Sequence, residues 1–265
     1  MWRLLHTPPA RGAFNMALDE ALMRRARETS TWLVRVYSWS SPTLSFGRNQ
    51  RARGGYDLEL LAQRGIDVVR RPTGGRAILH DHELTYAVAG PVEDAGDLRE
   101  SYVRINRLLV AGLRALGVGA VAVSREEALA SYETRVAELE QPGLLPCFHH
   151  PSVGEITLDG RKLVGSAQWR GDGALLQHGS ILIDDDQMQL ASFLIEKGAS
   201  IPPPATLRDA LGCAPTDLDM LRALLTAIRA EEDPDAEVIE VDAPLLEDAN
   251  ALQAHYLDDV WTWRR

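Results

Sequence analysis

The sequence is poor in cysteine and lysine and contains no long apolar run. Its only cysteines, Cys147 and Cys213, are too few for a disulfide framework, so both are expected to be reduced thiols. No stretch reaches the length of a membrane span, and the first residues do not form a basic-then-apolar signal peptide. These absences argue against a secreted disulfide scaffold and a membrane protein, and we expect a cytoplasmic chain.

Lysine is almost absent from the basic residues. Of 28 lysines and arginines, only Lys162 and Lys197 are lysine. Lysine differs from arginine in being a compact point charge whose pKa moves readily on burial. Either of these lysines is therefore a candidate for chemistry that arginine cannot perform, although codon bias would also explain the composition.

The formal net charge of −10 argues against general nucleic-acid binding. The charge is unevenly distributed, because residues 1–76 carry 13 arginines against 6 acidic residues. This basic third could steer an acidic protein or ligand toward the glycine-rich segment that ends it. The alternative is a solvated face that is rich in arginine.

The pattern mixes helices and strands without internal repeats, and 265 residues at 45% apolar content can bury a sizeable core. Helical spacing of apolar residues predicts helices at 13–28, 57–64, 98–116, 205–211, 216–230 and 245–257. Alternating or β-branched runs predict strands at 32–39, 43–47, 66–71, 76–80, 83–90, 174–183 and 237–241. Asp159-Gly160 is a strong hairpin signal between 155–158 and 162–169. Short, hairpin-like connections predict an α+β fold with a mixed, largely antiparallel central sheet flanked by helices.

The most distinctive segment is Arg-Arg-Pro-Thr-Gly-Gly-Arg at 70–76. Pro72 removes a backbone donor, and Gly74-Gly75 permits close approaches that a side chain would forbid. Such a loop can present backbone N–H groups and guanidinium groups to an acyl, phosphate or carboxylate oxygen. A hairpin turn with surface arginines is the simpler alternative.

Cys147 lies in a long irregular loop at 130–155, among two prolines and two histidines, which is untypical of a packed core thiol. Lowering a thiol pKa from about 8.5 to about 7 requires roughly 2 kcal/mol of differential stabilisation. A nearby Lys162 ammonium could supply it. Strand periodicity places Lys162, Val164, Ser166 and Gln168 on one face, which indicates either a lined cavity or a solvent-facing edge strand.

The remaining motifs carry weaker signals. Gly179, within a predicted strand, favours close approach of a ligand beside His178, although His178 could equally be a structural histidine. His80 and His82 offer two metal ligands without a clear third, and no P-loop or G-x-G-x-x-G motif is present, so no metal site is predicted. Cys213 is expected to be an inert thiol at a helix end.

Together these segments resemble the biotin/lipoate protein ligase and lipoyl/octanoyl transferase superfamily, and within it the octanoyltransferases of the LipM type. The matching segments, in order, are residues 14–22, 43–47, 70–76, 80–86, Cys147-Phe148, Pro151-Ser152, 160–168 and 176–180. The resemblance implies the catalytic-domain fold of that superfamily over 1–265, with a mainly helical segment at 205–265 packed on it. His149-His150 and Val153-Gly154 depart from the family pattern.

The resemblance also implies an activity. Octanoyl would pass from acyl carrier protein to a lysine of a lipoyl domain, such as that of the glycine-cleavage H protein. Cys147 would form the acyl-thioester and Lys162 would lower its pKa. The acyl group and its carbonyl would be held by Arg71, Thr73, Gly74, Gly75, Arg76, His80, Gly165, Ser166, Gln168, His178 and Gly179. No cofactor or metal would be needed, and a monomer is expected.

Three alternatives remain. An ATP-dependent lipoate ligase shares the loop and the Gly-Arg-Lys strand, but it typically has a third glycine at the position of Arg76 and lacks the cysteine nucleophile. An amidotransferase that moves octanoyl between lipoyl domains also uses a cysteine. The third alternative is a non-catalytic acyl-binding protein, against which the presence of both Cys147 and Lys162 counts.

Overall fold

In a computed structural model of the chain, residues 1–123, 154–195 and 203–264 are described. Within them the strands form an eight-stranded sheet in the order β11-β1-β2-β6-β10-β9-β8-β7 and a three-stranded sheet in the order β4-β3-β5. The large sheet contains β1 (Trp2–His6), β2 (Trp32–Tyr37), β6 (Glu83–Pro91), β7 (Val121–Ala122), β8 (Ile156–Leu158), β9 (Arg161–Gly171), β10 (Ala174–Leu182) and β11 (Glu237–Val238). The small sheet contains β3 (Thr43–Phe46), β4 (Asp67–Arg70) and β5 (Ile78–His80).

The strands are mostly antiparallel. In the large sheet β1 runs parallel to both β2 and β11, and every other neighbouring pair is antiparallel. In the small sheet β3 is parallel to β4 and antiparallel to β5. The predicted mixed, largely antiparallel sheet flanked by helices is therefore confirmed.

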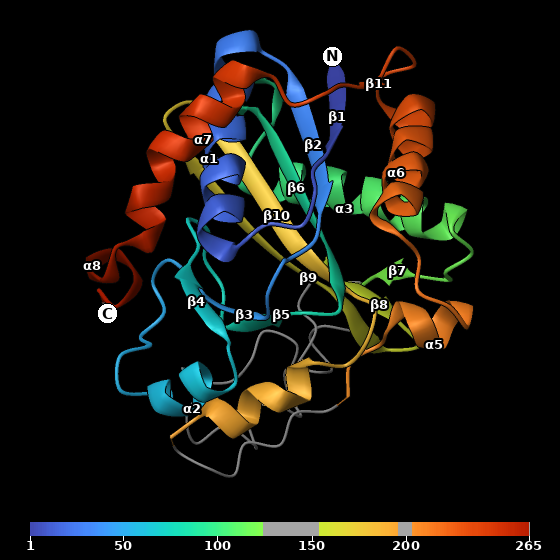
Figure 1. Ribbon diagram of the computed structural model, residues 1–265. Helices are drawn as coiled ribbons and strands as arrows, with labels where there is room; N and C mark the ends of the chain where they lie inside the picture. Colours follow the sequence, from blue (N-terminus) through green and yellow to red (C-terminus); the bar gives the residue numbers. More distant parts are fainter. Residues whose placement is uncertain (124–153, 196–202, 265) are drawn as a thin grey trace.

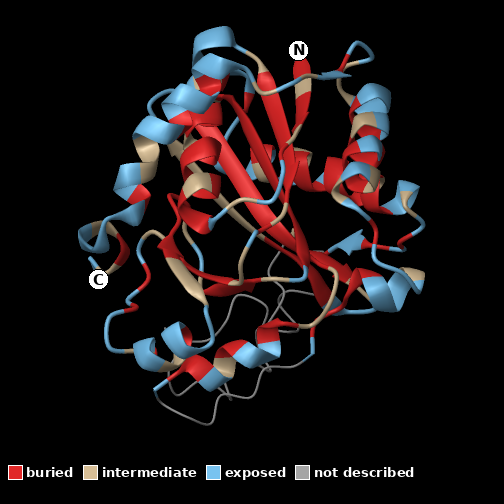
Figure 2. Cartoon of the chain, viewed as in Figure 1, coloured by how far each residue is buried: buried red, intermediate tan, exposed pale blue. Residues whose placement is uncertain are grey.

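Helices cover both faces of the large sheet (Figure 1). One face packs against α1 (Gly12–Thr29), which α7 (Ala243–Leu257) covers in turn, and the other packs against α3 (Leu98–Ala115) and α6 (Asp217–Glu231). Figure 2 shows the consequence, with buried strands in the centre and exposed residues on the outer surfaces of the helices. No helix among the described residues is long and apolar enough to cross a membrane.

The small sheet has its own apolar cluster beside the large one. Leu44 and Phe46 of β3 pack against Leu61 of α2 (Leu58–Gln63) and Phe193 of the 3-10 helix η2 (Gln187–Phe193). The chain is completed by η1 (Val92–Asp94), α5 (Leu207–Leu211) and α8 (Asp259–Thr262). α8 returns to the small sheet, where the Trp261 indole N–H donates to the Arg70 carbonyl at 2.8 Å.

Local signals account for the helix boundaries. Asp97 and Glu100 form a capping box at the start of α3, and Thr216 and Asp219 form another at the start of α6. α1 ends at Ser30, which adopts the left-handed conformation with φ of 50°. These helices agree with the predicted ones to within a few residues.

Five of the described elements were not predicted: β1, η1, β7, η2 and α8. β1 is recognisable only through its parallel register with β2, in which Trp2 lies opposite Trp32. The strand predicted at 76–80 begins only at Ile78, and the strand predicted at 237–241 shortens to β11. Each difference lies where pairing with a distant segment decides the structure.

Candidate functional site

The small sheet meets the large sheet at a small cavity. It is lined by Met16, Tyr37, Trp39, Arg71, Ile78, His80, Thr85, Gly165, Ser166, Ala167, His178 and Gly179. The surface that faces the cavity is mainly apolar, and α1, β2, β5, β6, β9 and β10 all contribute to it. Six predicted site residues therefore line one cavity: Arg71, His80, Gly165, Ser166, His178 and Gly179.

The Arg71 guanidinium lies inside the glycine-rich loop and bonds to its backbone carbonyls. Its guanidinium donates to the carbonyls of Gly74 at 2.9 Å and Arg76 at 2.6 Å, and to that of Ser45 at 3.0 Å. The alternative of a turn with surface arginines is wrong, because Arg70 and Arg71 are both buried. The loop is thus wrapped around a guanidinium on the cavity wall.

The two loop glycines have different roles. Gly75 has φ of 92°, and a Cβ there would lie 2.7 Å from Arg71 Nη2. Gly47 is equally constrained, since its Cβ would meet the Gly75 carbonyl oxygen at 2.0 Å. Gly74 has open space around its Cβ position. Of the two positions, only position 75 requires glycine, because of its positive φ and its close contact with Arg71.

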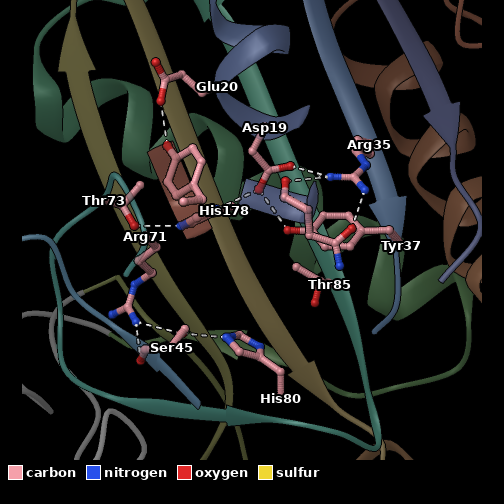
Figure 3. Close-up of polar contacts among 12 residues, drawn as sticks. Asp19, Glu20, Arg35, Tyr37, Ser45, Arg71, Thr73, His80, Thr85 and His178 are labelled. Carbon is pink, nitrogen blue, oxygen red and sulfur yellow. Dashed lines mark hydrogen bonds and ion pairs between the residues drawn. The ribbon is translucent and has the colours of Figure 1, made fainter. Parts of the chain in front are cut away.

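A buried row of polar side chains connects α1 to this loop (Figure 3). Asp19 Oδ2 lies 2.9 Å from His178 Nδ1, and His178 Nε2 lies 2.6 Å from Thr73 Oγ1. We call these three residues the Asp19 triad. Asp19 also accepts from Arg35 Nη1 at 2.8 Å and from the Tyr37 hydroxyl at 2.8 Å. The buried Arg35 guanidinium therefore balances the negative charge of Asp19, so a charge on His178 is not needed for this.

The chemistry of these groups fixes the protonation of His178. A carboxylate only accepts, so Nδ1 carries a hydrogen toward Asp19. Burial lowers the pKa of His178, more than Asp19 raises it, so the ring is neutral and Nε2 accepts from the Thr73 hydroxyl. Both ring nitrogens are thus satisfied by side chains.

A second row has the same composition on the opposite wall. Glu83 Oε1 lies 2.7 Å from His80 Nδ1, and His80 Nε2 lies 2.7 Å from Ser45 Oγ. We call these three residues the Glu83 triad. Ser45 Oγ also accepts from Arg71 Nη1 at 3.0 Å. Trp39 stacks on the His80 ring at 4.0 Å between centroids, which fixes the plane of the imidazole.

Three predicted residues lie elsewhere in the described chain or are oriented away from the cavity. Lys162 Nζ is 2.7 Å from Glu155 Oε1, and both residues are buried, so the alternative of a solvent-facing strand is wrong for Lys162. Ser166 lines the cavity, yet its hydroxyl accepts from the Tyr86 hydroxyl at 2.7 Å. Gln168 donates to Ser101 on α3 at 3.0 Å. Cys147 lies outside the described residues.

Gly179 is explained by strand packing. A Cβ there would lie 2.4 Å from the Gly165 carbonyl oxygen and 2.8 Å from the Tyr86 ring. Close approach of β9 and of a β6 side chain therefore requires glycine here, and the prediction that a ligand lies beside Gly179 stays a prediction.

The two histidines of the His80-Asp81-His82 segment diverge. His80 lines the cavity, whereas His82 is exposed, with its Nδ1 3.1 Å from Asp186 Oδ2. Asp186 raises the pKa of His82, chiefly by this hydrogen bond. Cys213 is exposed, just after Gly212 ends α5 in the left-handed conformation.

Several residues of the site were not found from the sequence: Asp19, Arg35, Ser45, Glu83 and Glu155. Asp19 carried one available signal, because an acidic residue lies within the apolar face of a predicted helix. Glu155 lies one residue before β8 and gave no comparable signal.

The comparisons with known proteins agree with this arrangement. The model of the lipoyl protein ligase A/B catalytic domain matches residues 11–229. The chain belongs to this family. Octanoyltransferase LipM of Kyrpidia tusciae is 40% identical over 284 residues, which cover 100% of this chain and 99% of that protein. Octanoyltransferase LipM of Staphylococcus epidermidis is 32% identical over 281 residues, again with 100% and 99% coverage. The predicted resemblance and the prediction of an acyltransferase are confirmed.

Solved structures share the fold. A lipoate-protein ligase A bound with ATP superposes with a TM-score of 0.77 at 22% identity, covering 98% of both chains. The bi-partite lipoate protein ligase of Thermoplasma acidophilum, solved in a study of its lipoylation system, gives 0.72 at 22% identity, covering 98% of this chain and 95% of that one. At such identities the likeness shows the catalytic-domain fold alone.

Proposed function

We propose that this chain transfers octanoyl from acyl carrier protein to a lysine of a lipoyl-domain protein, such as the glycine-cleavage H protein, in lipoate biosynthesis. The observation that carries the proposal is 40% identity to an octanoyltransferase LipM over the full length of both chains. The mainly apolar cavity beside the glycine-rich loop supports it.

The reaction divides into two acyl transfers. The Cys147 thiolate bonds to the carbonyl carbon of the octanoyl thioester, and the carbon–sulfur bond to the carrier breaks, so the carrier leaves as a thiolate that takes up a proton. The neutral amine of the acceptor lysine then bonds to the same carbon. The bond to Cys147 breaks, the amine proton is lost, and an amide remains with the thiolate restored.

The first transfer exchanges one thioester for another and is close to energetic balance, whereas the amide product draws the second forward. A straight eight-carbon chain gains about 5 kcal/mol from burial, at about 0.8 kcal/mol per methylene. We assign this burial to the cavity, where Met16, Ile78 and Ala167 offer apolar surface. The acyl carbonyl would lie toward the loop that carries Thr73 to Arg76.

Lys162 is proposed to act on Cys147 through its charge. Its contact with Glu155 keeps the ammonium in a buried ion pair, so the field that it exerts on the thiol depends on both residues. Neither ATP nor a metal ion takes part in the proposed reaction.

Intact-mass measurement tests the proposal. The protein is incubated with octanoyl-acyl carrier protein without ATP, and we expect one octanoyl group on the wild type and none on Cys147→Ala. Cys213→Ala is the matched control and should be acylated like the wild type, since Cys213 is exposed on α5's end. Acylation that requires ATP, or full activity of Cys147→Ala, would contradict the proposal and favour a ligase.

A further inference from the structure

We propose that the Asp19 triad and the Glu83 triad are positioning devices that hold loop 70–76 at two points for acyl transfer. The inference rests on the proposed function in one respect, namely that the activity measured in the tests below is acyl transfer. The geometry itself is independent of which acyl group is transferred.

Both triads have the same order of groups, carboxylate to imidazole to hydroxyl, and one ends on the loop while the other ends on a residue bonded to it. The Asp19 triad ends on Thr73, a residue of the loop, through a 2.6 Å contact. The Glu83 triad ends on Ser45, whose hydroxyl accepts from the Arg71 guanidinium at 3.0 Å. The loop is therefore fixed at Thr73 from the large sheet and at Arg71 from the small sheet.

Side chains occupy both ring nitrogens of each histidine. A base needs a ring nitrogen directed at the proton that it removes. In His178 the two nitrogens face Asp19 and Thr73, and in His80 they face Glu83 and Ser45. Each ring therefore reaches the substrate only through the hydroxyl at its end, and we infer that it positions this hydroxyl.

The loop has backbone attachments beside the two triads. The Thr73 carbonyl accepts from the Arg48 amide at 2.7 Å, and the Arg71 amide donates to Phe46 at 3.0 Å. The guanidinium of Arg71 also donates to the carbonyls of Gly74, Arg76 and Ser45. The loop reaches its position for acyl transfer only with both triads in place, so loss of either one displaces it.

Isosteric hydroxyl removal tests the proposal. Thr73→Val deletes the hydroxyl of one triad and Ser45→Ala that of the other, and each should lower kcat about 10- to 100-fold, because misplacement by about 1 Å costs on that scale. KM for the acyl carrier protein should change little. Thr73→Ser restores the hydroxyl and should recover most of the rate.

The double variant decides whether the two triads act on one loop. If they do, Thr73→Val with Ser45→Ala is no slower than about the slower single variant, because a loop already displaced cannot be displaced twice. If the two losses in kcat multiply, the triads act independently and the proposal is wrong. Thr43→Val is the matched control, since its buried hydroxyl bonds to Ser41 at 3.0 Å and not to the loop, and its kcat should equal that of the wild type.

Two readouts do not depend on activity. Hydrogen exchange at the Arg48 amide reports the position of the loop, because that amide donates to Thr73, and it should become faster in both single variants but not in Thr43→Val. The ring nitrogen resonances of His178 should show the Nδ1–H form in the wild type and a shift of Nε2 in Thr73→Val. Unchanged Arg48 exchange in the slow variants would overturn the positioning role.

The two proposals can fail separately. If the wild type requires ATP for acylation while Arg48 exchange responds as expected, the proposed function is wrong and the positioning role stands. If Cys147→Ala is inactive and the wild type needs no ATP, but the losses in kcat multiply in the double variant, the proposed function stands and the positioning role is wrong.

Discussion

At the scale of single residues, the site consists of polar side chains whose roles depend on hydrogen-bond partners far away in the sequence. His80, His178 and Arg71 were found because they occur in recognisable segments. Asp19 was not, since its partner His178 lies 159 positions away. A buried carboxylate requires a hydrogen-bond donor, but the sequence does not say which one. Side-chain chemistry could therefore be predicted, and side-chain pairing could not.

His178 gives a prediction at this scale because its folded pKa is lowered by burial, with Asp19, Arg71 and His80 facing the ring. The unfolded chain then binds the proton more readily. The stabilisation is fully present above the unfolded pKa of about 6.5 and is lost as the pH falls toward the folded pKa, by up to about 1.4 kcal/mol per pH unit.

We expect His178→Gln, which keeps a donor and an acceptor without titrating, to flatten this loss. Denaturant unfolding at pH 7.5 and pH 5.5 measures it. His82→Gln is the control with opposite sign, because Asp186 raises the pKa of His82, whose stabilising effect is present at low pH and lost as the pH rises. Equal acid sensitivity of wild type and His178→Gln would contradict the expectation.

At the scale of helices and strands, periodic segments were predicted well and pairing-dependent ones were not. α1, α3 and the β9–β10 region have local signals of spacing, capping and turn residues. β1, β7 and β11 are short strands at or near the sheet edges, and they are defined by their neighbours rather than by their own residues. The loop at 70–76 was correctly recognised as special, but its wrapping around Arg71 depends on contacts with β3.

β10 gives the prediction at this scale. Gly179→Ala would place a methyl group 2.4 Å from the Gly165 carbonyl oxygen, so β9 and β10 would have to separate. We expect a loss of about 1–3 kcal/mol in the free energy of unfolding, together with lower activity, because the same residue lines the cavity. Denaturant titration and the acylation assay measure the two effects.

Gly119→Ala is the matched control, since its Cβ would meet nothing within 4 Å. It should leave both quantities close to those of the wild type. A stable, fully active Gly179→Ala would show that the two strands adjust without cost.

At the scale of the whole molecule, we propose that residues 1–265 form one catalytic domain with the helical segment 205–265 as part of its core. Met220, Leu224 and Ile228 of α6 belong to the cluster that includes β1, β2 and α3. Leu245 and Tyr256 of α7 belong to the cluster around α1. Charge is also paired across the chain, since Arg3 and Arg25 of the basic third pair with Glu237 and Asp242.

A chain ending at Pro204 should therefore fail to fold cooperatively. Each large apolar side chain removed from its buried position forfeits about 1.5–3 kcal/mol, and the total exceeds the 5–15 kcal/mol that stabilises a typical domain. Circular dichroism during urea titration measures the transition. A sharp transition near that of the full chain would show instead that the helical segment is an appendage.

Arg70 links the glycine-rich loop to residues 47–50 and to α8. Its guanidinium donates to the carbonyls of Gly47 at 2.6 Å, Gln50 at 2.9 Å and Thr262 at 2.8 Å, while its own carbonyl accepts from Trp261. These contacts join residues 47–50, 70 and 261–262, so the three segments should be exchanged together when chimeras are made. Chimeric enzymes made by exchanging the glycine-rich loop between relatives would keep their activity only if the crossover points carry the matching terminal helix along with the loop.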